Sequence, residues 1–427
     1  MTIFVVTYAL IISEKIHRSV IGIIGALVLI VFGILSFEQA IDYINWETIG
    51  LLMGMFTLVA LLSEAGFFSF MALWTARLFH YKARLIFIAF PVLAALLAAF
   101  MDSVTVTLFL TLLTLRLCRL FKTDPVPFVI AEVMAANVGG AATLVGDPPN
   151  VIIGTIMGYS FSDFATNTGP IVIVAISVLM FYLYFTHRSL FGNDGEDIVN
   201  EDIKSMNPVS AIKSAFLLRL GLIAFAAAVA GLILKEPIKA WFGVEYNSAV
   251  AALLPASIAL AFLGEHAHRI IDHLDYDILL FFMALFVIVG GLEATGAIEV
   301  MARWLVSLAG GSALGMIFLL LFGTGITSAV VDNVPLALAM AYIIKSISQA
   351  GGLALPLMVW TLALGVDIGG NMTPIGASAN VVAYSLLKSK DTSVSWAYWL
   401  KEAVIPTLLV LGVCYGMLLL KLYTGWY

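Results

Sequence analysis

Two similar stretches, one in each half of this chain, interrupt long apolar segments. Residues 137–152 read NVGGAATLVGDPPNVI, and residues 367–382 read DIGGNMTPIGASANVV. Each places glycines and polar side chains within a segment that is otherwise apolar. In a membrane such a stretch frees backbone groups from the helix, which is tolerated only where protein or a polar cavity covers them. Two broken helices in equivalent halves are typical of the binding site of a secondary transporter.

The composition also indicates a membrane protein. The chain of 427 residues is 62% hydrophobic and only 11% charged, whereas soluble domains carry about 25% charged residues. Cys118 and Cys414 lie far apart, and neither a CxxC nor an HExxH sequence occurs. We therefore expect no structural metal, no cofactor and no enzyme active site. The absence of a P-loop sequence means that this chain is not itself an ATP-driven motor.

The similarity between the halves extends far beyond the two interruptions. The numerical offset that separates Asn137 from Asp367 also separates many other pairs of similar residues. We call two positions that differ by this offset repeat-equivalent. A constant offset without gaps over a long stretch indicates an internal duplication. With an odd number of spans in each half, the second half inserts upside down relative to the first, as in alternating-access carriers. Repeat-equivalent pairs include Val20 and Val250, Met53 and Met283, Trp74 and Trp304, and Asp102 and Asp332.

The predicted fold class is an all-α polytopic membrane protein made of two inverted repeats. Each repeat is expected to hold about five spans, one of them a broken helix, together with a re-entrant hairpin. In this scheme the first repeat is 1–187, with its hairpin at 84–120 and its broken helix at 128–158. A cytoplasmic linker covers 188–214, and the second repeat is 215–427, with its hairpin at 313–345 and its broken helix at 354–385.

The distribution of basic residues predicts the orientation. If the linker lies inside, most Lys and Arg residues of the short loops also lie inside, among them Arg18, the run Arg77–Arg84 and the run Arg116–Lys122. This arrangement satisfies the positive-inside rule, and the opposite arrangement violates it. The expected location is the inner, cytoplasmic membrane of a cell, with both termini outside.

Four aspartates are candidates for proton or cation coupling. Asp102 and Asp332 lie at the predicted hairpin tips, and Asp147 and Asp367 belong to the interrupted stretches. A carboxylate within a bilayer is costly, which favours a functional role such as a proton relay or an ion site. The alternative is a helix cap, since Asp at a helix N-terminus accepts hydrogen bonds from free backbone N–H groups. Glu132 is a further acid, in the helix that leads into the first break.

Neutral polar side chains and glycines complete the predicted site. Serine, threonine and asparagine can line a substrate cavity, and they also commonly join neighbouring membrane helices. The hairpin tips and helix breaks contain no Lys or Arg, which favours a cation, a proton or a neutral polyhydroxylated solute over an organic dianion. The candidate substrate-binding residues are Asn137, Thr143, Asn150, Asn333, Asn371, Thr373, Ser378 and Asn380, and the glycines that expose backbone at the breaks are Gly139, Gly140, Gly146, Gly369, Gly370 and Gly376.

These motifs resemble those of a known family. The sequences GGAATLVGDPPNVIIG and GGNMTPIGASANVV, with the tips MDSVTVTLF and VDNVPLALA, are similar to those of ArsB/NhaD-type permeases of the ion transporter superfamily. That family includes arsenical pump membrane proteins, sodium/proton antiporters and a melanosomal permease. The resemblance covers essentially the whole chain and implies a dimerising scaffold with a mobile transport region, hence a possible homodimer.

The resemblance leaves three functions open. The first is proton-coupled efflux of arsenite and antimonite, with protons moving through the four aspartates. The second is sodium/proton exchange at the same residues. The third is a channel-like subunit that works with a separate cytoplasmic, arsenite-stimulated ATPase. No nucleic-acid partner is expected.

Overall fold

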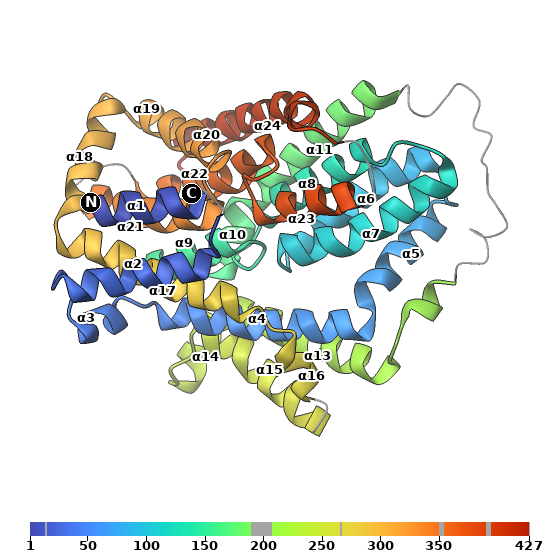
Figure 1. Ribbon diagram of the computed structural model, residues 1–427, viewed down its shortest axis with the longest axis horizontal. Coiled ribbons are helices and arrows are strands. Elements are labelled where there is room, and N and C mark those ends of the chain that lie inside the picture. The colour runs from blue at the N-terminus through green and yellow to red at the C-terminus, as the bar shows by residue number, and fades with distance from the viewer. Residues whose placement is uncertain (13–14, 189–206, 265–266, 350–353, 390–393, 427) are drawn as a thin grey trace.

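The computed structural model describes the chain except for residues 13–14, 189–206, 265–266, 350–353, 390–393 and 427 (Figure 1). Within the described ranges every regular element is a helix, which confirms the predicted all-α class. Most of the predicted linker at 188–214 lies outside the described residues. The elements before it are α1 (Thr2–Ile12), α2 (Arg18–Val31), α3 (Phe37–Asp42), α4 (Trp46–Ala65), α5 (Phe67–Leu78), α6 (Ala83–Ala98), α7 (Ser103–Phe121), α8 (Val126–Gly140), α9 (Pro148–Met157), α10 (Phe161–Asn167) and α11 (Gly169–His187).

The elements after the linker follow the same order. A short 3-10 turn, η2 (Pro208–Ala211), leads into them. They are α13 (Ala215–Ile233), α14 (Lys235–Phe242), α15 (Ser248–Leu263), α16 (Ala267–Asp272), α17 (Tyr276–Ala294), α18 (Ala297–Leu308), α19 (Ala313–Phe318), the π-helical turn η4 (Leu319–Gly323), α20 (Thr324–Ser328), α21 (Asn333–Gln349), α22 (Leu355–Gly369), the 3-10 turn η5 (Gly370–Met372), α23 (Ser378–Ser389) and α24 (Trp396–Thr424).

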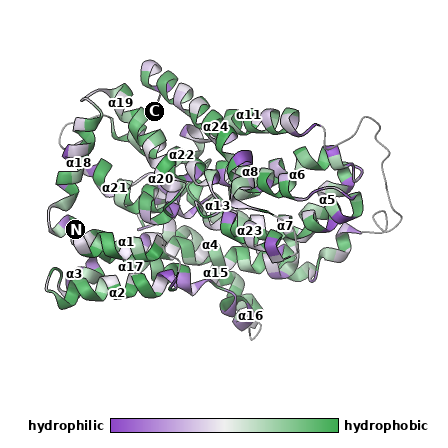
Figure 2. Ribbon diagram, turned by 45° about the horizontal axis from the view of Figure 1, so that its top comes forward, coloured by the Kyte–Doolittle hydropathy of each residue, from purple (hydrophilic) through white to green (hydrophobic). Residues whose placement is uncertain are grey.

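The protein is a multi-pass membrane protein. Among the described residues, seven helices are long and apolar enough to cross a bilayer, and an eighth span results if the bent pair α18 and 313–328 is counted as one. Several other predicted spans are shorter apolar helices. The apolar run at 19–36, for example, is long enough to suggest a span, but its helix α2 ends at Val31 because Gly33 turns the backbone to φ 69°. Hydrophobic residues make up most of the length of the helices (Figure 2).

Both predicted re-entrant hairpins are helical hairpins in the structure. The first consists of α6 and α7, which meet at residues 99–102, and the second consists of α19–α20 and α21, which meet at 329–332. Their entering arms are irregular at equivalent positions. Helix α6 contains Pro91, and its repeat-equivalent position, Leu321, falls within the π-helical turn. Both irregularities alter the ordinary α-helical hydrogen-bond ladder, so each arm is able to bend on its way to the tip.

The two interrupted stretches are breaks between half-helices. The first break separates α8 from α9, and the second separates α22 and η5 from α23. Each break packs closely against the nearest hairpin. A Cβ atom on Gly139 would lie 2.3 Å from the carbonyl oxygen of Ala95, and one on Gly369 would lie 2.2 Å from the Cα atom of Gly325. Glycine is therefore required at both positions, because any side chain would push the hairpin away from the broken helix.

The helices form two layers in Figure 1. The framework layer contains α2 to α4 and α13 to α17, and the hairpin layer contains the two hairpins, the two broken helices, α11 and α24. Small residues let framework helices approach closely, which is a common means of packing in membranes. A Cβ atom on Gly54 of α4 would lie 2.6 Å from the backbone of Ala252 on α15, and one on Gly22 of α2 would lie 3.1 Å from the Cβ atom of Ala284 on α17.

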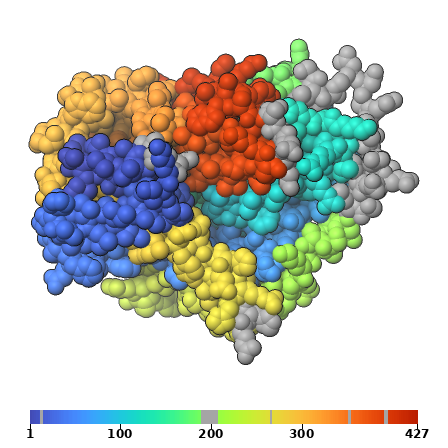
Figure 3. All heavy atoms as spheres, viewed as in Figure 1, coloured from blue at the N-terminus to red at the C-terminus, as the bar shows by residue number. Residues whose placement is uncertain are grey.

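The first helix connects the two layers. In the space-filling view of Figure 3, the dark blue N-terminal residues lie directly beside the orange second hairpin. The Tyr8 hydroxyl of α1 donates a hydrogen bond to the carbonyl oxygen of Pro335 in α21, at 2.9 Å. Helix α1 thus contacts the second hairpin close to its tip.

Candidate functional site

Two asparagines hold the helix breaks in the same way. The Asn150 side-chain amide donates to the carbonyl oxygens of Gly140 and Thr143, at 3.0 and 3.2 Å. The Asn380 amide donates to the carbonyl oxygens of Gly370 and Thr373, at 2.8 and 2.7 Å. These are carbonyls that a continuous helix would pair internally, so each asparagine satisfies the backbone that its break leaves open. Gly146 and Gly376 contribute space, because a Cβ atom on either would lie 2.3 Å from a carbonyl oxygen of the same break.

Two threonines attach the breaks to the hairpin tips. The Thr143 hydroxyl donates to the carbonyl oxygen of Ala99, and the Thr373 hydroxyl donates to that of Ala329. Each hydroxyl also accepts from the backbone N–H two residues later. In this conformation both hydroxyls make structural hydrogen bonds that position the breaks against the tips, and their predicted contact with substrate stays a prediction.

Asn137 joins the two broken helices to each other. Its amide nitrogen donates to the side-chain oxygens of Asn371 and Asn380, both at 2.8 Å. Asn371 in turn donates to the carbonyl oxygen of Met134, at 3.3 Å. The three asparagines are fully buried. Their hydrogen bonds fix the crossing point of the halves at the centre of the hairpin layer.

Asp147 joins both hairpins at this crossing. Its two carboxylate oxygens accept from the Ser103 hydroxyl, at 2.6 Å, and from the Asn333 amide, at 2.9 Å. Ser103 and Asn333 are the first residues of α7 and α21, so one side chain contacts both tips. Although Asp147 occupies the position before α9, its side chain accepts no cap hydrogen bond there. The cap interpretation therefore does not describe Asp147.

Asp367 is fully buried beside Asp147. Among the described residues neither of its carboxylate oxygens makes a well-formed hydrogen bond, and both the Asn150 amide group and the Asp147 carboxyl lie near them. The side-chain oxygens of Asn137 and Asn150 are also buried, with no hydrogen-bond partner in the part of the chain that the structure describes. The centre of the site is therefore rich in acceptor oxygens that require donors, a proton or a cation.

The two hairpin tips differ in their contacts. The Asp102 carboxylate caps α7 by accepting from the backbone N–H of Thr105, at 2.8 Å. The Asp332 carboxylate accepts from the backbone N–H of Val334, at 3.2 Å, and pairs with the guanidinium of Arg18, at 2.9 Å. Arg18 also donates to the Ser378 hydroxyl, at 3.1 Å. The Asp102 carboxylate is thus engaged within its own hairpin, whereas the Asp332 carboxylate is tied to the framework layer.

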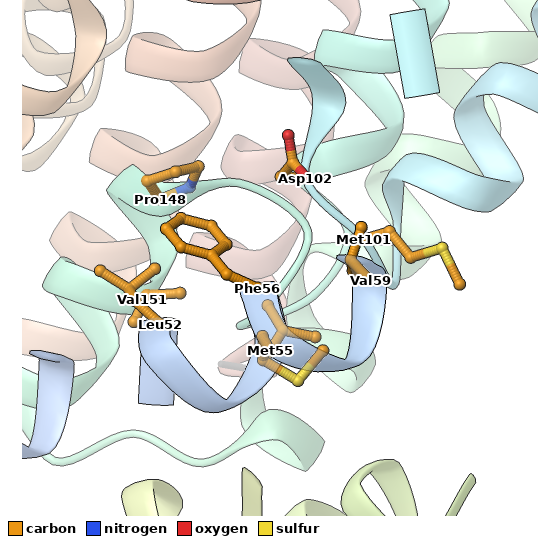
Figure 4. A pocket seen from close by; sticks show the side chains of 9 residues that line it. Leu52, Met55, Phe56, Val59, Met101, Asp102, Pro148 and Val151 are labelled. Atoms are coloured by element: carbon orange, nitrogen blue, oxygen red, sulfur yellow. The ribbon is translucent and has the colours of Figure 1, made fainter. Parts of the chain in front are cut away.

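The first tip borders a cavity between the layers. This cavity of about 320 Å³ is lined by Asp102 and Thr105 of the hairpin and by Ser63, Glu64 and Asp275 of the framework side. A smaller apolar pocket continues from Asp102 towards α9, where Phe56 of α4 faces Pro148 and Val151 (Figure 4). The Phe56 ring thus stands between the larger cavity and the start of α9.

The structure places the predicted site residues at three separate locations. Asp147, Asp367 and the buried asparagines meet at the crossing of the broken helices, and Asn333 joins them from the second tip. Asp332 and Ser378 lie together at Arg18, and Asp102 faces the cavity. No group of three or more His, Cys, Asp or Glu side chains able to hold a metal occurs among the described residues.

Sequence reasoning misses two partners of the aspartates. It treats Arg18 only as an inside charge, because nothing in the sequence connects the start of α2 to a hairpin tip in the other half of the chain. Ser103 follows Asp102 directly and carries a visible signal, since a hydroxyl at a hairpin tip is itself a polar group at membrane depth.

The comparison with known families settles the broad class. A family model described as "Citrate transporter" (CitMHS) matches residues 8–365 and 247–426. The chain belongs to the CitMHS family. The two matched ranges overlap, as is expected when the halves of a chain are similar to each other.

Relatives extend along the whole chain. A "46 kDa membrane protein" of Mycobacterium leprae is 33% identical over 419 residues, covering 96% of each chain. An uncharacterized transporter of Mycobacterium tuberculosis is 34% identical over 429 residues, covering 97% of this chain and 96% of the relative. The human P protein is 29% identical over 498 residues, covering 98% of this chain but only 59% of that longer protein.

Solved structures share the fold. The YdaH transporter of Alcanivorax borkumensis superposes with a TM-score of 0.61 over 91% of this chain and 88% of that one, at 13% identity. MtrF of Neisseria gonorrhoeae gives a TM-score of 0.56 over 92% and 83%, at 11% identity. At such low identities the likeness concerns the fold alone. The family match and the relatives make this CitMHS protein a membrane transporter, while the narrower ArsB/NhaD-type resemblance stays a prediction.

Proposed function

We propose that this CitMHS-family transporter exports arsenite and antimonite in exchange for protons, and that Asp147 and Asp367 couple the two movements. The observation that carries the proposal is the buried acidic pair at the crossing of the broken helices, where the Asp367, Asn137 and Asn150 oxygens have no partner among the described residues. Buried carboxylates of this kind in membrane transporters are typical of proton or cation sites.

The chemistry of the site fits a neutral hydroxylated substrate. Arsenite at neutral pH is an uncharged trihydroxide, so it offers O–H donors and no charge. The free oxygens of Asp367, Asn137 and Asn150 are acceptors that such donors can satisfy. When Asp367 binds a proton, it loses acceptor capacity and binds the hydroxyls less well. Proton and substrate therefore compete for the same oxygens, which is what an exchanger requires.

Sodium/proton exchange is the second candidate, and one observation favours it. Within the described ranges, the unpaired side-chain atoms at the crossing are oxygens of the Asp367 carboxylate and of the Asn137 and Asn150 amides, and hard cations prefer such ligands. In this alternative Na⁺ occupies the position given above to the substrate hydroxyls, and the same aspartates exchange it for protons.

The test is transport in everted membrane vesicles with an imposed proton gradient. Arsenite accumulation that follows the gradient and ignores sodium supports the proposal. Sodium-dependent proton release without arsenite movement overturns it in favour of cation exchange. Citrate is assayed in parallel because the matching family model is named for it. Accumulation of citrate alone overturns both candidates, and the Asp367→Asn variant serves as the uncoupled reference.

A further inference from the structure

Four hydroxyl side chains form a line along one face of α7. Ser103, Thr107, Thr111 and Thr114 are spaced by three or four residues, which places them one above another on a helix. All four are buried, and Thr107 and Thr111 are 0% exposed. The line runs from the hairpin tip towards the end of α7 that joins α8.

The two middle hydroxyls lack the partner that threonine usually has in a helix. Thr57, Thr361 and Thr407 each donate to the carbonyl oxygen four residues earlier, at 2.8, 2.6 and 2.6 Å. Thr107 and Thr111 donate to no such carbonyl, and among the described residues neither hydroxyl has a hydrogen-bond partner. Buried polar atoms without a protein partner are the places where proteins hold internal water.

An acid lies at each end of this line. Ser103 at the tip donates to Asp147. Thr114 at the other end donates to one oxygen of Glu132, a residue of α8 that is 1% exposed, and the second Glu132 oxygen is buried without a partner among the described residues. The hydroxyls therefore lie between two buried carboxyl groups that belong to different parts of the broken helix.

The second half of the chain provides a natural comparison. Ala337, Ala341 and Ile344 are the repeat-equivalents of the three threonines, and Leu362 is the repeat-equivalent of Glu132. The second hairpin therefore packs against its broken helix with apolar side chains at every one of these positions. Since packing of this architecture does not need the hydroxyls, their presence in the first half calls for another explanation.

We propose that this hydroxyl line, bridged by water, is the path by which protons reach Asp147 from Glu132. The proposal rests on the proton coupling proposed above and specifies its route. Helix geometry separates successive hydroxyl-bearing positions by about 6 Å or less along the axis, a gap that one water bridges with a hydrogen bond on each side. In each step an oxygen accepts a proton and passes on its own. The net change is one O–H bond broken at Glu132 and one formed at Asp147, without oxidation or reduction.

Titratable side chains lie near both ends of the line. The Cys118 thiol of α7 is close enough to Glu132 to sense its charge. Asp102, Asp332 and Asp367 act on Asp147. Cys118 is replaced in the second experiment below, so it cannot account for the outcome there.

The first experiment separates coupling from substrate movement. In proteoliposomes, Glu132→Gln keeps a hydrogen-bonding side chain beside Thr114 but removes the proton carrier, and Thr111→Val removes one hydroxyl at nearly constant volume. Both are expected to lower gradient-driven transport about tenfold or more, as for the loss of a positioned proton carrier, while substrate exchange at equal pH continues. Thr111→Ser should retain the rate. The matched control is Thr361→Val, which removes an equally buried hydroxyl that only bonds its own helix.

The second experiment needs no substrate. In a chain with Cys118→Ala and Cys414→Ala, Thr111→Cys is exposed to silver ions, which are water-sized thiol reagents, and the remaining free thiol is titrated with a maleimide after unfolding. Ala341→Cys is the control at the repeat-equivalent apolar position. If silver blocks the reaction of maleimide with the thiol of the Thr111→Cys variant but not with that of the Ala341→Cys variant, the result supports a water-filled path.

The outcomes distinguish the two proposals. If wild-type protein transports no arsenite but the Thr111→Cys thiol alone reacts with silver, the proposed substrate fails and the path stands. If arsenite export is proton-coupled while Glu132→Gln and Thr111→Val behave as the control and both thiols stay unreactive, the path is overturned. A folded Glu132→Gln variant with full coupling overturns it as well.

Discussion

Asp367 and Asn137 occupy equivalent positions in the two halves, yet only the Asn137 side chain makes well-formed hydrogen bonds. Asn137 donates to two other asparagines, whereas both Asp367 oxygens are buried and make no well-formed hydrogen bond to any residue that the structure describes. We predict that Asp367→Asn, which makes the halves alike, leaves the melting temperature unchanged or raises it. Coupled transport should fall to background because the titratable group is gone. A combined melting curve and vesicle assay tests this, and a large loss of stability with transport retained would contradict it.

Asp147→Asn should behave differently because both carboxylate oxygens of Asp147 already accept hydrogen bonds. An amide places an NH₂ group against either the Ser103 hydroxyl or the Asn333 amide, so one buried donor loses its acceptor. The expected cost is about 1–3 kcal/mol of stability, together with loss of coupling. Chemical unfolding of the purified variant in detergent measures the cost. Stability equal to that of Asp367→Asn would show that these hydrogen bonds are not needed.

The contacts of these residues show where sequence reasoning succeeds and where it stops. The constant offset between the halves placed Asn150 and Asn380 at equivalent breaks, and the structure gives them equivalent hydrogen bonds. The same offset cannot reveal asymmetric contacts. Arg18 reaches Asp332 across the fold, whereas its repeat-equivalent, Ser248, donates its backbone N–H to the Glu47 carboxylate. Pairing between distant elements depends on packing that a repeat pattern does not contain.

At the scale of elements, the hairpins depend on glycine contacts with the broken helices. Gly139→Ala introduces a methyl group within 2.3 Å of the Ala95 carbonyl oxygen, so the first hairpin must move. Overpacking of this kind typically costs about 1–3 kcal/mol, and we expect a lower melting temperature and reduced transport. Gly412→Ala on α24 is the matched control, since nothing lies within 4 Å of its Cβ position. If Gly139→Ala and Gly412→Ala had the same melting temperature and transport rate, the close packing of Gly139 against Ala95 would be refuted.

The tie between Arg18 and Asp332 is the second prediction at this scale. Both side chains are partly exposed, at 31% and 18%, so the ion pair is only partly screened by solvent. A double-mutant cycle with Arg18→Gln and Asp332→Asn should give a coupling energy of about 1 kcal/mol, within the range for residues in direct contact. Additive effects of the two substitutions on stability would show that the pair contributes nothing. The Asp332→Asn variant should also lose coupled transport if this carboxylate belongs to the proton route.

The whole molecule exposes one hairpin tip to a cavity and ties the other to the framework layer, which predicts access from one side. Ser63 lines the cavity at Asp102, whereas Ser36 caps α3 at a different part of the framework layer. A membrane-impermeant maleimide should label Ser63→Cys from the cytoplasmic face and Ser36→Cys from the outer face. Background labelling of the native cysteines should be low because Cys118 and Cys414 are buried. Labelling of both from one face would contradict the predicted orientation.

Most of the architecture at this scale is readable from sequence. Apolar runs predict the spans, and polar residues at 101–105 and 331–335 predict the tips of helical hairpins. The early end of α2 and the π-helical turn in the second hairpin are not predicted, because both depend on local backbone geometry within an uninterrupted apolar run. The cavity at Asp102 is also beyond reach, since it arises only where the two layers meet.

The apolar residues that are repeat-equivalent to the threonines of the hydroxyl line affect how well the protein separates protons across the membrane. A carrier that draws energy from a proton gradient must conduct protons to its site and must also insulate the rest of the membrane. If the hydroxyl line conducts protons as proposed, Ala337, Ala341 and Ile344 would supply that insulation, because apolar side chains offer water no hydrogen-bond partners along the second hairpin. The two hairpins are repeat-equivalent, but one carries threonines where the other carries apolar residues. On the proposed path, this difference would let the first hairpin conduct protons and keep the second from conducting them.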